Sequence, residues 1–148
     1  MLQTIEHGRI REIRLDRPPV NALNPELVSG LAEALEQAGR EAGGVILSGR
    51  EGMFSAGLDV PELLALDRSA MGEFWGAFAG LLETIARMPV PTVAAITGHS
   101  PAGGAVMSLF CDYRVMSRGP WKIGLNIQGE VVKSIGSHSC TGLIKFLV

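Results

Sequence analysis

The sequence has little of what metal-binding and nucleic-acid-binding proteins need. Its two cysteines, Cys111 and Cys140, form no C-x-x-C pair, and its three histidines are scattered along the chain. This pattern argues against a metal site and against a disulfide framework. The net charge of −2, without any cluster of lysine and arginine, gives no basic surface for nucleic acid. These absences leave a cytoplasmic or organelle-matrix enzyme as the default expectation.

Long hydrophobic runs are also missing. The longest apolar stretches, such as residues 93–96, are far too short to cross a bilayer. The N-terminal segment MLQTIEHGRI is charged and lacks the apolar core of a secretory signal. We therefore expect no membrane partner and see no targeting signal.

What the chain does have is a folding composition and many glycines. Hydrophobic residues make up 47% and charged residues 19% of its 148 residues, which is enough for one domain with one core. The 19 glycines gather where strands are expected to lead into helices. They are the unusual feature of the composition.

The N-terminal third predicts a strand pair followed by a helix. Residues 3–7 and 9–16 alternate apolar and charged side chains, as on a half-buried sheet. Asn24 is a good N-cap and Pro25 suits the first helical position. Apolar residues then recur every three or four positions to Ala38, and two glycines end the helix.

The remaining elements alternate between strand and helix. A short apolar run at 45–47 predicts a buried strand, followed by a loop over 49–59 and a short helix from Pro61. The later elements expected are a long helix capped by Ser69, a strand over 92–97, a helix that ends at Phe110 and a strand over 113–117. This alternation predicts an α/β fold with a largely parallel sheet. The turns FSAGLD (54–59) and GHSPAGG (98–104), both rich in small residues, should then lie at the same edge of that sheet.

The turn GHSPAGG looks at first like the nucleophile elbow of a serine hydrolase. In that motif the residue after the serine donates its backbone N–H to the oxyanion, but here that residue is Pro101, which has none. The turn is also one residue too long, because Ala102 stands where the second glycine belongs. A phosphate-binding loop is excluded as well, since Gly104-Ala105 replaces the required Lys-Ser/Thr.

A third interpretation needs no nucleophile. Two turns at one sheet edge can each direct a backbone N–H at a single oxygen, which polarises a carbonyl and stabilises an enolate-like oxyanion. Small residues let the backbone approach the ligand closely. The alternative is that both segments are ordinary tight turns beside closely packed helices.

At these residues the chain resembles the crotonase (enoyl-CoA hydratase/isomerase) superfamily, and within it the mitochondrial-type Δ3-Δ2-enoyl-CoA isomerases. The stretches that carry the resemblance are RPPVNALN (17–24), GVILSGREGMFSAGLDV (44–60), GHSPAGGAVMSLFCDYRVMS (98–117) and WKIGLN (121–126). The resemblance implies an α/β crotonase-like (ClpP/crotonase) fold with a spiral core of repeated ββα units. It implies an acyl-CoA-binding core over 1–126 and an atypical tail over 127–148, in place of the family's C-terminal helical region.

The resemblance also implies roles for individual residues. The backbone N–H groups of Leu58 and Gly103 match the oxyanion-hole donors for the thioester oxygen. The positions that match the region holding the adenine and phosphate portion of CoA are Asn21, Ala22, Leu23, Ser55, Ala56 and Gly57. Asp59 and Asn126 match positions that line the acyl end, although Asp59 could instead cap the helix at Pro61. The aromatic residues Phe74, Trp75 and Phe78 either wall an acyl tunnel or belong to the core.

The chain departs from the family at its carboxylates. Val106 stands where hydratases have their first glutamate, which is the isomerase pattern. Ile127 stands where the remaining catalytic glutamate is expected, and it cannot carry a proton. Glu130 is the nearest carboxylate and becomes a weak candidate acid/base; the alternative is that it is a solvated surface residue.

We therefore expect an acyl-CoA-binding protein of the isomerase lineage of fatty-acid β-oxidation. The alternative is a truncated, catalytically inactive domain that binds acyl-CoA or other subunits. The resemblance implies no metal and no cofactor beyond the coenzyme A of the substrate. It implies a homo-oligomer, because family members form trimers, and a bacterial cytoplasmic or mitochondrial matrix location.

Overall fold

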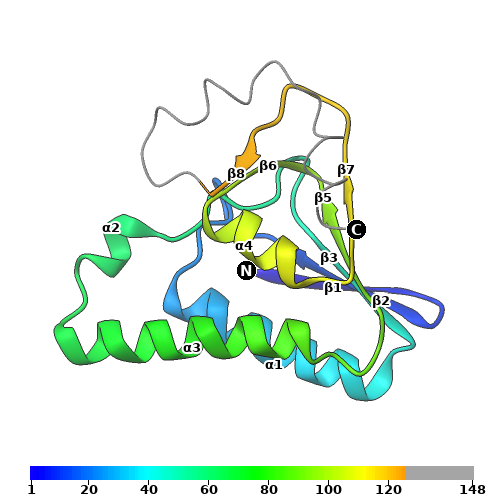
Figure 1. Ribbon diagram of the computed structural model, residues 1–148, viewed down its shortest axis with the longest axis horizontal. Coiled ribbons are helices and arrows are strands. Elements are labelled where there is room, and N and C mark those ends of the chain that lie inside the picture. The colour runs from blue at the N-terminus through cyan, green and yellow to red at the C-terminus, as the bar shows by residue number, and fades with distance from the viewer. Residues whose placement is uncertain (126–148) are drawn as a thin grey trace.

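The computed structural model describes residues 1–125 of the chain. Figure 1 shows helices and strands that alternate along this part of the sequence. The elements are β1 (Leu2–His7), β2 (Ile10–Leu15), α1 (Pro25–Glu41), β3 (Gly44–Ser48), β4 (Gly52–Met53), α2 (Val60–Leu63), α3 (Arg68–Ala86), β5 (Thr92–Ile96), β6 (Gly98–Pro101), α4 (Gly103–Phe110), β7 (Tyr113–Met116) and β8 (Ile123–Gly124).

The strands form two sheets. A five-stranded sheet has the order β1-β2-β3-β5-β7, and a three-stranded sheet has the order β4-β6-β8. The hairpin β1–β2 is antiparallel, whereas β2, β3, β5 and β7 pair in parallel. This confirms the α/β prediction with a largely parallel sheet.

The chain passes three times from a strand of the large sheet to a strand of the small sheet. β3 leads into β4, β5 into β6 and β7 into β8, and helices follow β4 and β6. The chain therefore repeats a strand–strand–helix unit. The short strands β4, β6 and β8 were not predicted, because each has only two to four residues and is held by pairing with distant partners.

A close contact between two glycines joins β4 to β6. A methyl group placed on Gly98 would lie 1.9 Å from the carbonyl carbon of Gly52. No side chain fits between two backbones at that distance. Residues 98–104 were expected to form a single turn. They form instead the strand β6 followed by the start of α4.

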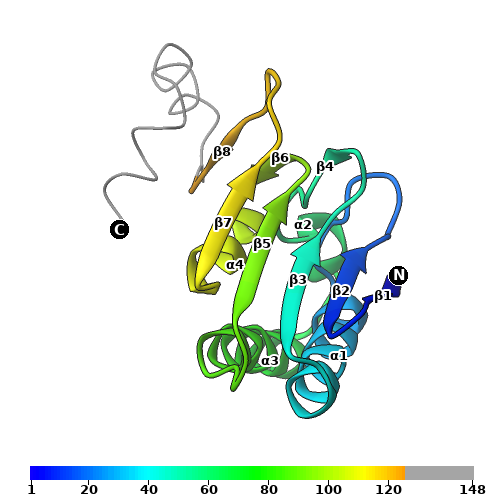
Figure 2. The ribbon, with the colours of Figure 1, turned by 90° about the vertical axis from the view of Figure 1, so that its right-hand side faces the viewer.

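The core lies on one side of the large sheet. Alternate residues of the strands, such as Ile13, Leu15, Val45 and Leu47, are almost completely buried there. α1 and α3 pack side by side against this face, and Figure 2 shows the opposite face with none of the described helices in front of it. Within the described part of the chain, no helix is long and apolar enough to cross a membrane.

The helix starts confirm one predicted cap and correct another. The Asn24 side chain accepts a hydrogen bond from the backbone N–H of Leu27 at 2.9 Å and caps α1, as predicted. The prediction that Ser69 caps the long helix was wrong. Asp67 caps α3 instead and accepts from the N–H of Ala70 at 2.8 Å, two residues earlier in the chain.

The Asp67 cap leads to a first prediction. We expect Asp67→Ala to destabilise the protein by about 1 kcal/mol, because it leaves an N-terminal N–H of α3 without its acceptor. Ser69→Ala, inside the same helix, should change the free energy of unfolding by less than about 0.5 kcal/mol. Urea denaturation of both variants checks this, and an equal loss in the two would contradict the assignment.

Candidate functional site

The two glycine-rich turns predicted to meet at one sheet edge are in contact. A methyl group on Gly57 would lie 2.9 Å from the backbone nitrogen of Gly103 and 2.9 Å from the Cβ of Ala102. Gly57 also has a φ of 90°, which L side chains rarely adopt. Glycine is therefore required at position 57 both for the backbone angle and for the approach of the second turn.

The direction of the Leu58 N–H is set by a neighbouring segment. The carbonyl of Gly57 accepts a hydrogen bond from the N–H of Leu23 at 2.7 Å, and the N–H of Asp59 donates to the carbonyl of Leu23 at 2.9 Å. In a trans peptide the C=O and N–H point in opposite directions. The N–H of Leu58 therefore points away from Leu23, and it has no acceptor among residues 1–125.

The second N–H belongs to Gly103, the first residue of α4. The carbonyl in its peptide group, that of Ala102, accepts from the N–H of Val106 at 3.0 Å, so the Gly103 N–H points out of the helix start. It too has no acceptor within the described part of the chain. Ala102 has a φ of 47°, a strained conformation for alanine and one that is often found at functional sites.

These two N–H groups form the candidate site. They lie on turns that touch, and one stands at the positive end of a helix dipole. Such donors bind an oxygen on which negative charge develops, and they need no side chain to do so.

The segments at 21–23 and 55–57 do come together, but their polar side chains point inward. The amide nitrogen of Asn21 donates to the carbonyls of Phe54 at 3.0 Å and Leu15 at 3.1 Å, and its oxygen accepts from the N–H of Arg17 at 2.8 Å. The Ser55 hydroxyl donates to the carbonyl of Asn21 at 2.7 Å. Asn21, Leu23 and Ser55 are completely buried. The polar side chains of Asn21 and Ser55 are thus bonded within the fold and are not presented at the surface.

Asp59 has the structural role that was the alternative to lining the acyl end. One of its carboxylate oxygens accepts from the N–H of Glu62 at 3.2 Å and caps α2, and the other binds Arg17 at 2.7 Å. Both oxygens are thus engaged. Its predicted place at the acyl end stays a prediction, as does that of Asn126, which lies outside the described residues together with Ile127 and Glu130.

The possible nucleophiles are poorly placed. Ser100 lies in β6 and is completely buried, so its hydroxyl is not presented as in a nucleophile elbow. Burial raises the pKa of the Cys111 thiol to about 12, which keeps it protonated at neutral pH. Among residues 1–125, no three His, Cys, Asp or Glu side chains are grouped as a metal site requires.

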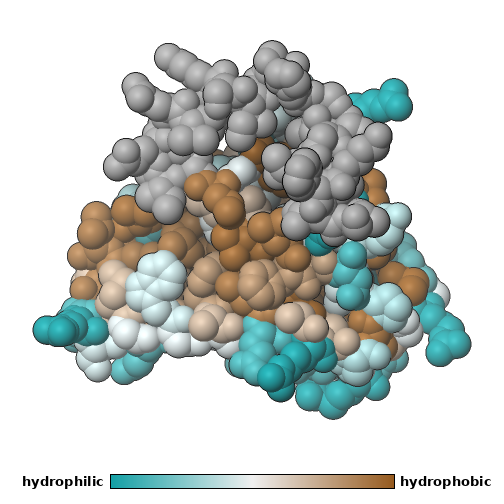
Figure 3. Space-filling view, viewed as in Figure 1, coloured by the Kyte–Doolittle hydropathy of each residue, from teal (hydrophilic) through white to brown (hydrophobic). Residues whose placement is uncertain are grey.

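The aromatic residues of α3 divide between core and surface. Phe74 and Phe78 are buried in the core, whereas Trp75 is 49% exposed. Apolar side chains gather over α2 and α4 on the face seen in Figure 3, with Val60, Leu64, Leu109 and Phe110 among the exposed ones. The two helices that follow the turns, α2 and α4, therefore both carry exposed apolar side chains.

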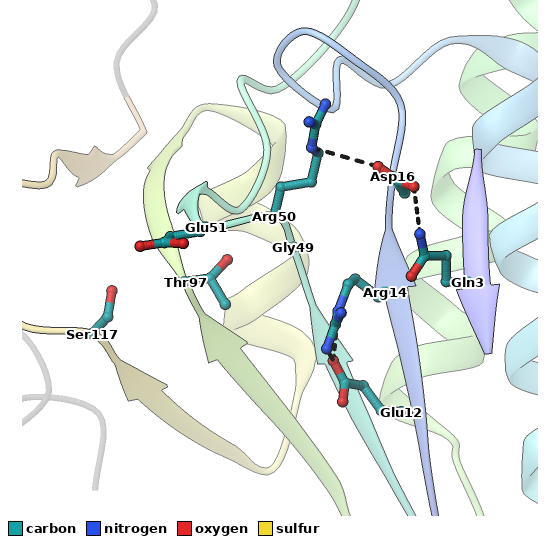
Figure 4. A pocket seen from close by; sticks show the side chains of 9 residues that line it. All are labelled: Gln3, Glu12, Arg14, Asp16, Gly49, Arg50, Glu51, Thr97 and Ser117. Atoms are coloured by element: carbon teal, nitrogen blue, oxygen red, sulfur yellow. Dashed lines mark hydrogen bonds and ion pairs between the residues drawn. The ribbon is translucent and has the colours of Figure 1, made fainter. Parts of the chain in front are cut away.

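A separate hollow of about 550 Å³ lies on the uncovered face of the large sheet. Figure 4 shows two pairs of its charged side chains facing one another, Arg14 with Glu12 and Arg50 with Asp16. Burial raises the pKa of Glu12, but hydrogen bonds from Ser48, His7 and Arg14 outweigh it and leave that pKa below the ordinary value. The Glu12 carboxylate is thus satisfied internally, and this hollow is not the candidate site.

Comparison with known proteins decides the family. A protein-family profile described as Enoyl-CoA hydratase/isomerase matches residues 6–130, well over half of the chain. The chain belongs to the enoyl-CoA hydratase/isomerase family. This confirms the resemblance to the crotonase superfamily that the two turns carried.

Relatives in the enoyl-CoA hydratase/isomerase family include isomerases and hydratases. Enoyl-CoA delta isomerase 1, mitochondrial, of Rattus norvegicus is 38% identical over 121 residues, which are 79% of this chain and 42% of the rat protein. A probable enoyl-CoA hydratase of Rhizobium meliloti is 35% identical over 113 residues, 74% of this chain and 43% of that protein. The chain thus spans less than half the length of each of these two relatives.

A solved structure from the same family has the same fold. The crystal structure of human mitochondrial delta3-delta2-enoyl-CoA isomerase matches with a TM-score of 0.81 at 30% identity, over 99% of this chain and 57% of that chain. The predicted crotonase-like α/β fold is confirmed. The strand–strand–helix repeat described above is its observed form in residues 1–125.

The sequence alone assigned no role to two charged residues, the half-buried Arg17 and the buried Glu12. Arg17 stands in the stretch RPPVNALN, yet it pairs with Asp59, 42 residues away. Glu12 alternates with apolar residues as a surface side chain would, yet it is only 8% exposed and accepts a hydrogen bond from Ser48 of the neighbouring strand at 2.6 Å. Neither the Arg17–Asp59 contact nor the Glu12–Ser48 contact is indicated by a periodic pattern in the sequence.

Proposed function

We propose that this chain binds the thioester group of an acyl-CoA, with the N–H groups of Leu58 and Gly103 donating to the thioester oxygen. The observation that carries the proposal is the pair of N–H groups on touching turns, neither with an acceptor among residues 1–125. Membership of the enoyl-CoA hydratase/isomerase family supports the choice of ligand. The apolar surface over α2 and α4 suits the acyl portion.

The proposed reaction is that of the Δ3-Δ2-enoyl-CoA isomerase lineage in fatty-acid β-oxidation. Removal of a proton from C2 moves negative charge onto the thioester oxygen, where two N–H donors stabilise it as a dienolate. Return of the proton at C4 moves the double bond from position 3 to position 2. The relatives named as delta isomerases support this lineage over water addition, as does Val106.

The remaining site assignments belong to the same proposal. Residues 21–23 and 55–57 would hold the adenine and phosphate portion of CoA through their backbone, and Asp59 and Asn126 would lie near the acyl end. Glu130 is the proposed acid/base. Coenzyme A enters as part of the substrate, and a homo-oligomer in the bacterial cytoplasm or the mitochondrial matrix is the proposed setting.

A second candidate function is an inactive acyl-CoA-binding or subunit-interaction domain. Both carboxylate oxygens of Asp59 are occupied, and position 106 is valine, so residues 1–125 supply no unengaged carboxylate adjoining the N–H pair. A protein with the donors and without the acid/base would bind thioesters and not isomerise them.

Calorimetry with acetyl-CoA and S-ethyl-CoA tests the proposal. The second compound keeps the CoA portion and lacks the thioester oxygen. Two hydrogen bonds of about 1 kcal/mol each predict a preference of roughly thirtyfold for acetyl-CoA. Equal affinities would overturn the role of the two N–H groups. Turnover of a 3-enoyl-CoA then separates the enzyme from the binding domain, and activity unchanged in Glu130→Gln would remove Glu130 as the acid/base.

A further inference from the structure

Arg17 makes three contacts beside the proposed site. One guanidinium nitrogen, Nη1, donates to the carboxylate of Asp59 at 2.7 Å and to the carbonyl of Ala22 at 3.1 Å. The other, Nη2, donates to the carboxylate of Glu62 at 2.9 Å. The side chain is 22% exposed, so these contacts are partly shielded from water.

The contact with Ala22 begins a chain of hydrogen-bonded peptide groups. The Ala22 carbonyl and the Leu23 N–H belong to one peptide group, and that N–H donates to the carbonyl of Gly57 at 2.7 Å. The Gly57 carbonyl and the Leu58 N–H belong to the next peptide group. The guanidinium of Arg17 is therefore linked to the proposed Leu58 donor through two peptide groups in series.

Each donor in such a series polarises the next. A cationic donor on a peptide C=O makes that peptide's N–H a stronger donor, and the effect passes along the chain. Asp59 and Glu62 balance the charge of Arg17, so Arg17 exerts little long-range electric field on the Leu58 N–H. Its effect on that N–H is to orient and polarise the two hydrogen-bonded peptide groups between them. The ion pairs also hold the guanidinium where it can bind Ala22.

We propose that Arg17 is a positioning residue, which acts through the peptide groups of Ala22–Leu23 and Gly57–Leu58 to aim and strengthen the N–H of Leu58. The inference rests on the proposed binding of a thioester oxygen there. It adds a residue that does not touch the ligand and yet governs how strongly the carbonyl is polarised.

The chain offers a matched control in Arg11. This arginine also bridges two carboxylates, Glu6 at 2.6 Å and Glu41 at 2.8 Å, and its side chain is 16% exposed. It reaches neither turn. Arg17→Met and Arg11→Met thus remove similar ion pairs, and only the first removes the contact with Ala22.

The decisive readout is the ¹³C resonance of [1-¹³C]acetyl-CoA bound to each protein. Hydrogen bonds to the carbonyl move this resonance downfield. We expect the largest shift in the wild type and in Arg11→Met, an intermediate shift in Arg17→Lys, and the smallest in Arg17→Met. Arg17→Lys keeps the positive charge and an ion pair but loses the planar guanidinium. This variant therefore still tests the proposal if Arg17→Met fails to fold. The affinity for free CoA should stay within about twofold in both Arg17 variants.

Amide hydrogen exchange gives a readout without ligand. The Leu23 N–H should exchange about tenfold faster in Arg17→Met than in Arg11→Met, because its hydrogen bond to Gly57 is loosened. An unchanged carbonyl shift in the Arg17 variants, with a normal shift in the wild type, would overturn the positioning role and leave the proposed function standing. Absence of any shift in the wild type would overturn both.

Discussion

Gly57→Ala is expected to remove thioester binding and to destabilise the protein by about 2–4 kcal/mol, since it adds a left-handed alanine and overpacks a contact. The new methyl group would lie 2.9 Å from the Gly103 nitrogen and 3.2 Å from the carbonyl oxygen of Pro101. Both neighbours are backbone atoms, so no side-chain rotation can relieve the clash. The two turns would therefore be pushed apart, and their N–H groups would no longer meet at one oxygen.

Urea denaturation and calorimetry with acetyl-CoA measure the two effects of Gly57→Ala. The control is Gly76→Ala, an exposed position inside α3 where a methyl group meets nothing within 4 Å. Because glycine is unfavourable inside a helix, this control should gain about 0.5–1 kcal/mol and bind normally. If Gly57→Ala binds acetyl-CoA as the wild type does, the touching turns are not the binding site.

Gly103→Pro is expected to abolish the preference for acetyl-CoA over S-ethyl-CoA, because proline has no N–H to donate. Position 103 is the first residue of α4, so the N–H that proline lacks is not one that makes a hydrogen bond within the helix. In an active protein, loss of one such donor should lower kcat for isomerisation by about 10²–10³-fold. The CoA portion should still bind, so the affinity for S-ethyl-CoA is the internal reference.

Two further variants separate the lost N–H from steric effects. Gly103→Ala keeps the donor, and its methyl group would meet the side-chain end of Leu23 at 3.0 Å and, at ordinary contact distance, the Cα of Gly57 at 3.4 Å and the side-chain end of Leu58 at 3.5 Å. It should keep most of the preference. A backbone ester at position 103, with glycolic acid in place of glycine, removes the N–H without adding an atom group. An undiminished preference in the ester protein would exclude Gly103 as a donor.

Local sequence was sufficient wherever the interaction was local. The cap at Asn24 was predicted because its side chain bonds a backbone group three residues away. The parallel strands were predicted at 45–47 and 92–97 from apolar runs between glycines and prolines, and they are observed as β3 and β5. The glycine-rich turns were placed at one edge by the rule that carboxyl ends of parallel strands face the same way. The cap at Ser69 was wrong because Asp67 offered the same local chemistry two residues earlier.

The rest depended on contacts between distant segments. Nothing near residue 98 shows that it pairs with residue 52, since the signal is only that both are glycines. Arg17 pairs across 42 residues, and a charged residue before two prolines gives no hint of that partner. The donors of Leu58 and Gly103 came from a resemblance, because a backbone N–H is present at almost every residue and has no signature of its own.

The proposed site relies on backbone N–H groups, and such donors do not depend on which side chain the residue carries. Any amino acid but proline supplies the same donor at position 58, so replacing the side chain of Leu58 leaves the atom that matters in place. Selection on such a site acts on the neighbouring residues that orient the peptide groups. These are Gly57, which leaves room for the second turn, Ala102 with its positive φ, and Arg17 with its guanidinium on the Ala22 carbonyl. A mutational scan would therefore respond strongly at Gly57, Ala102 and Arg17, whereas at Leu58 it would respond chiefly to proline.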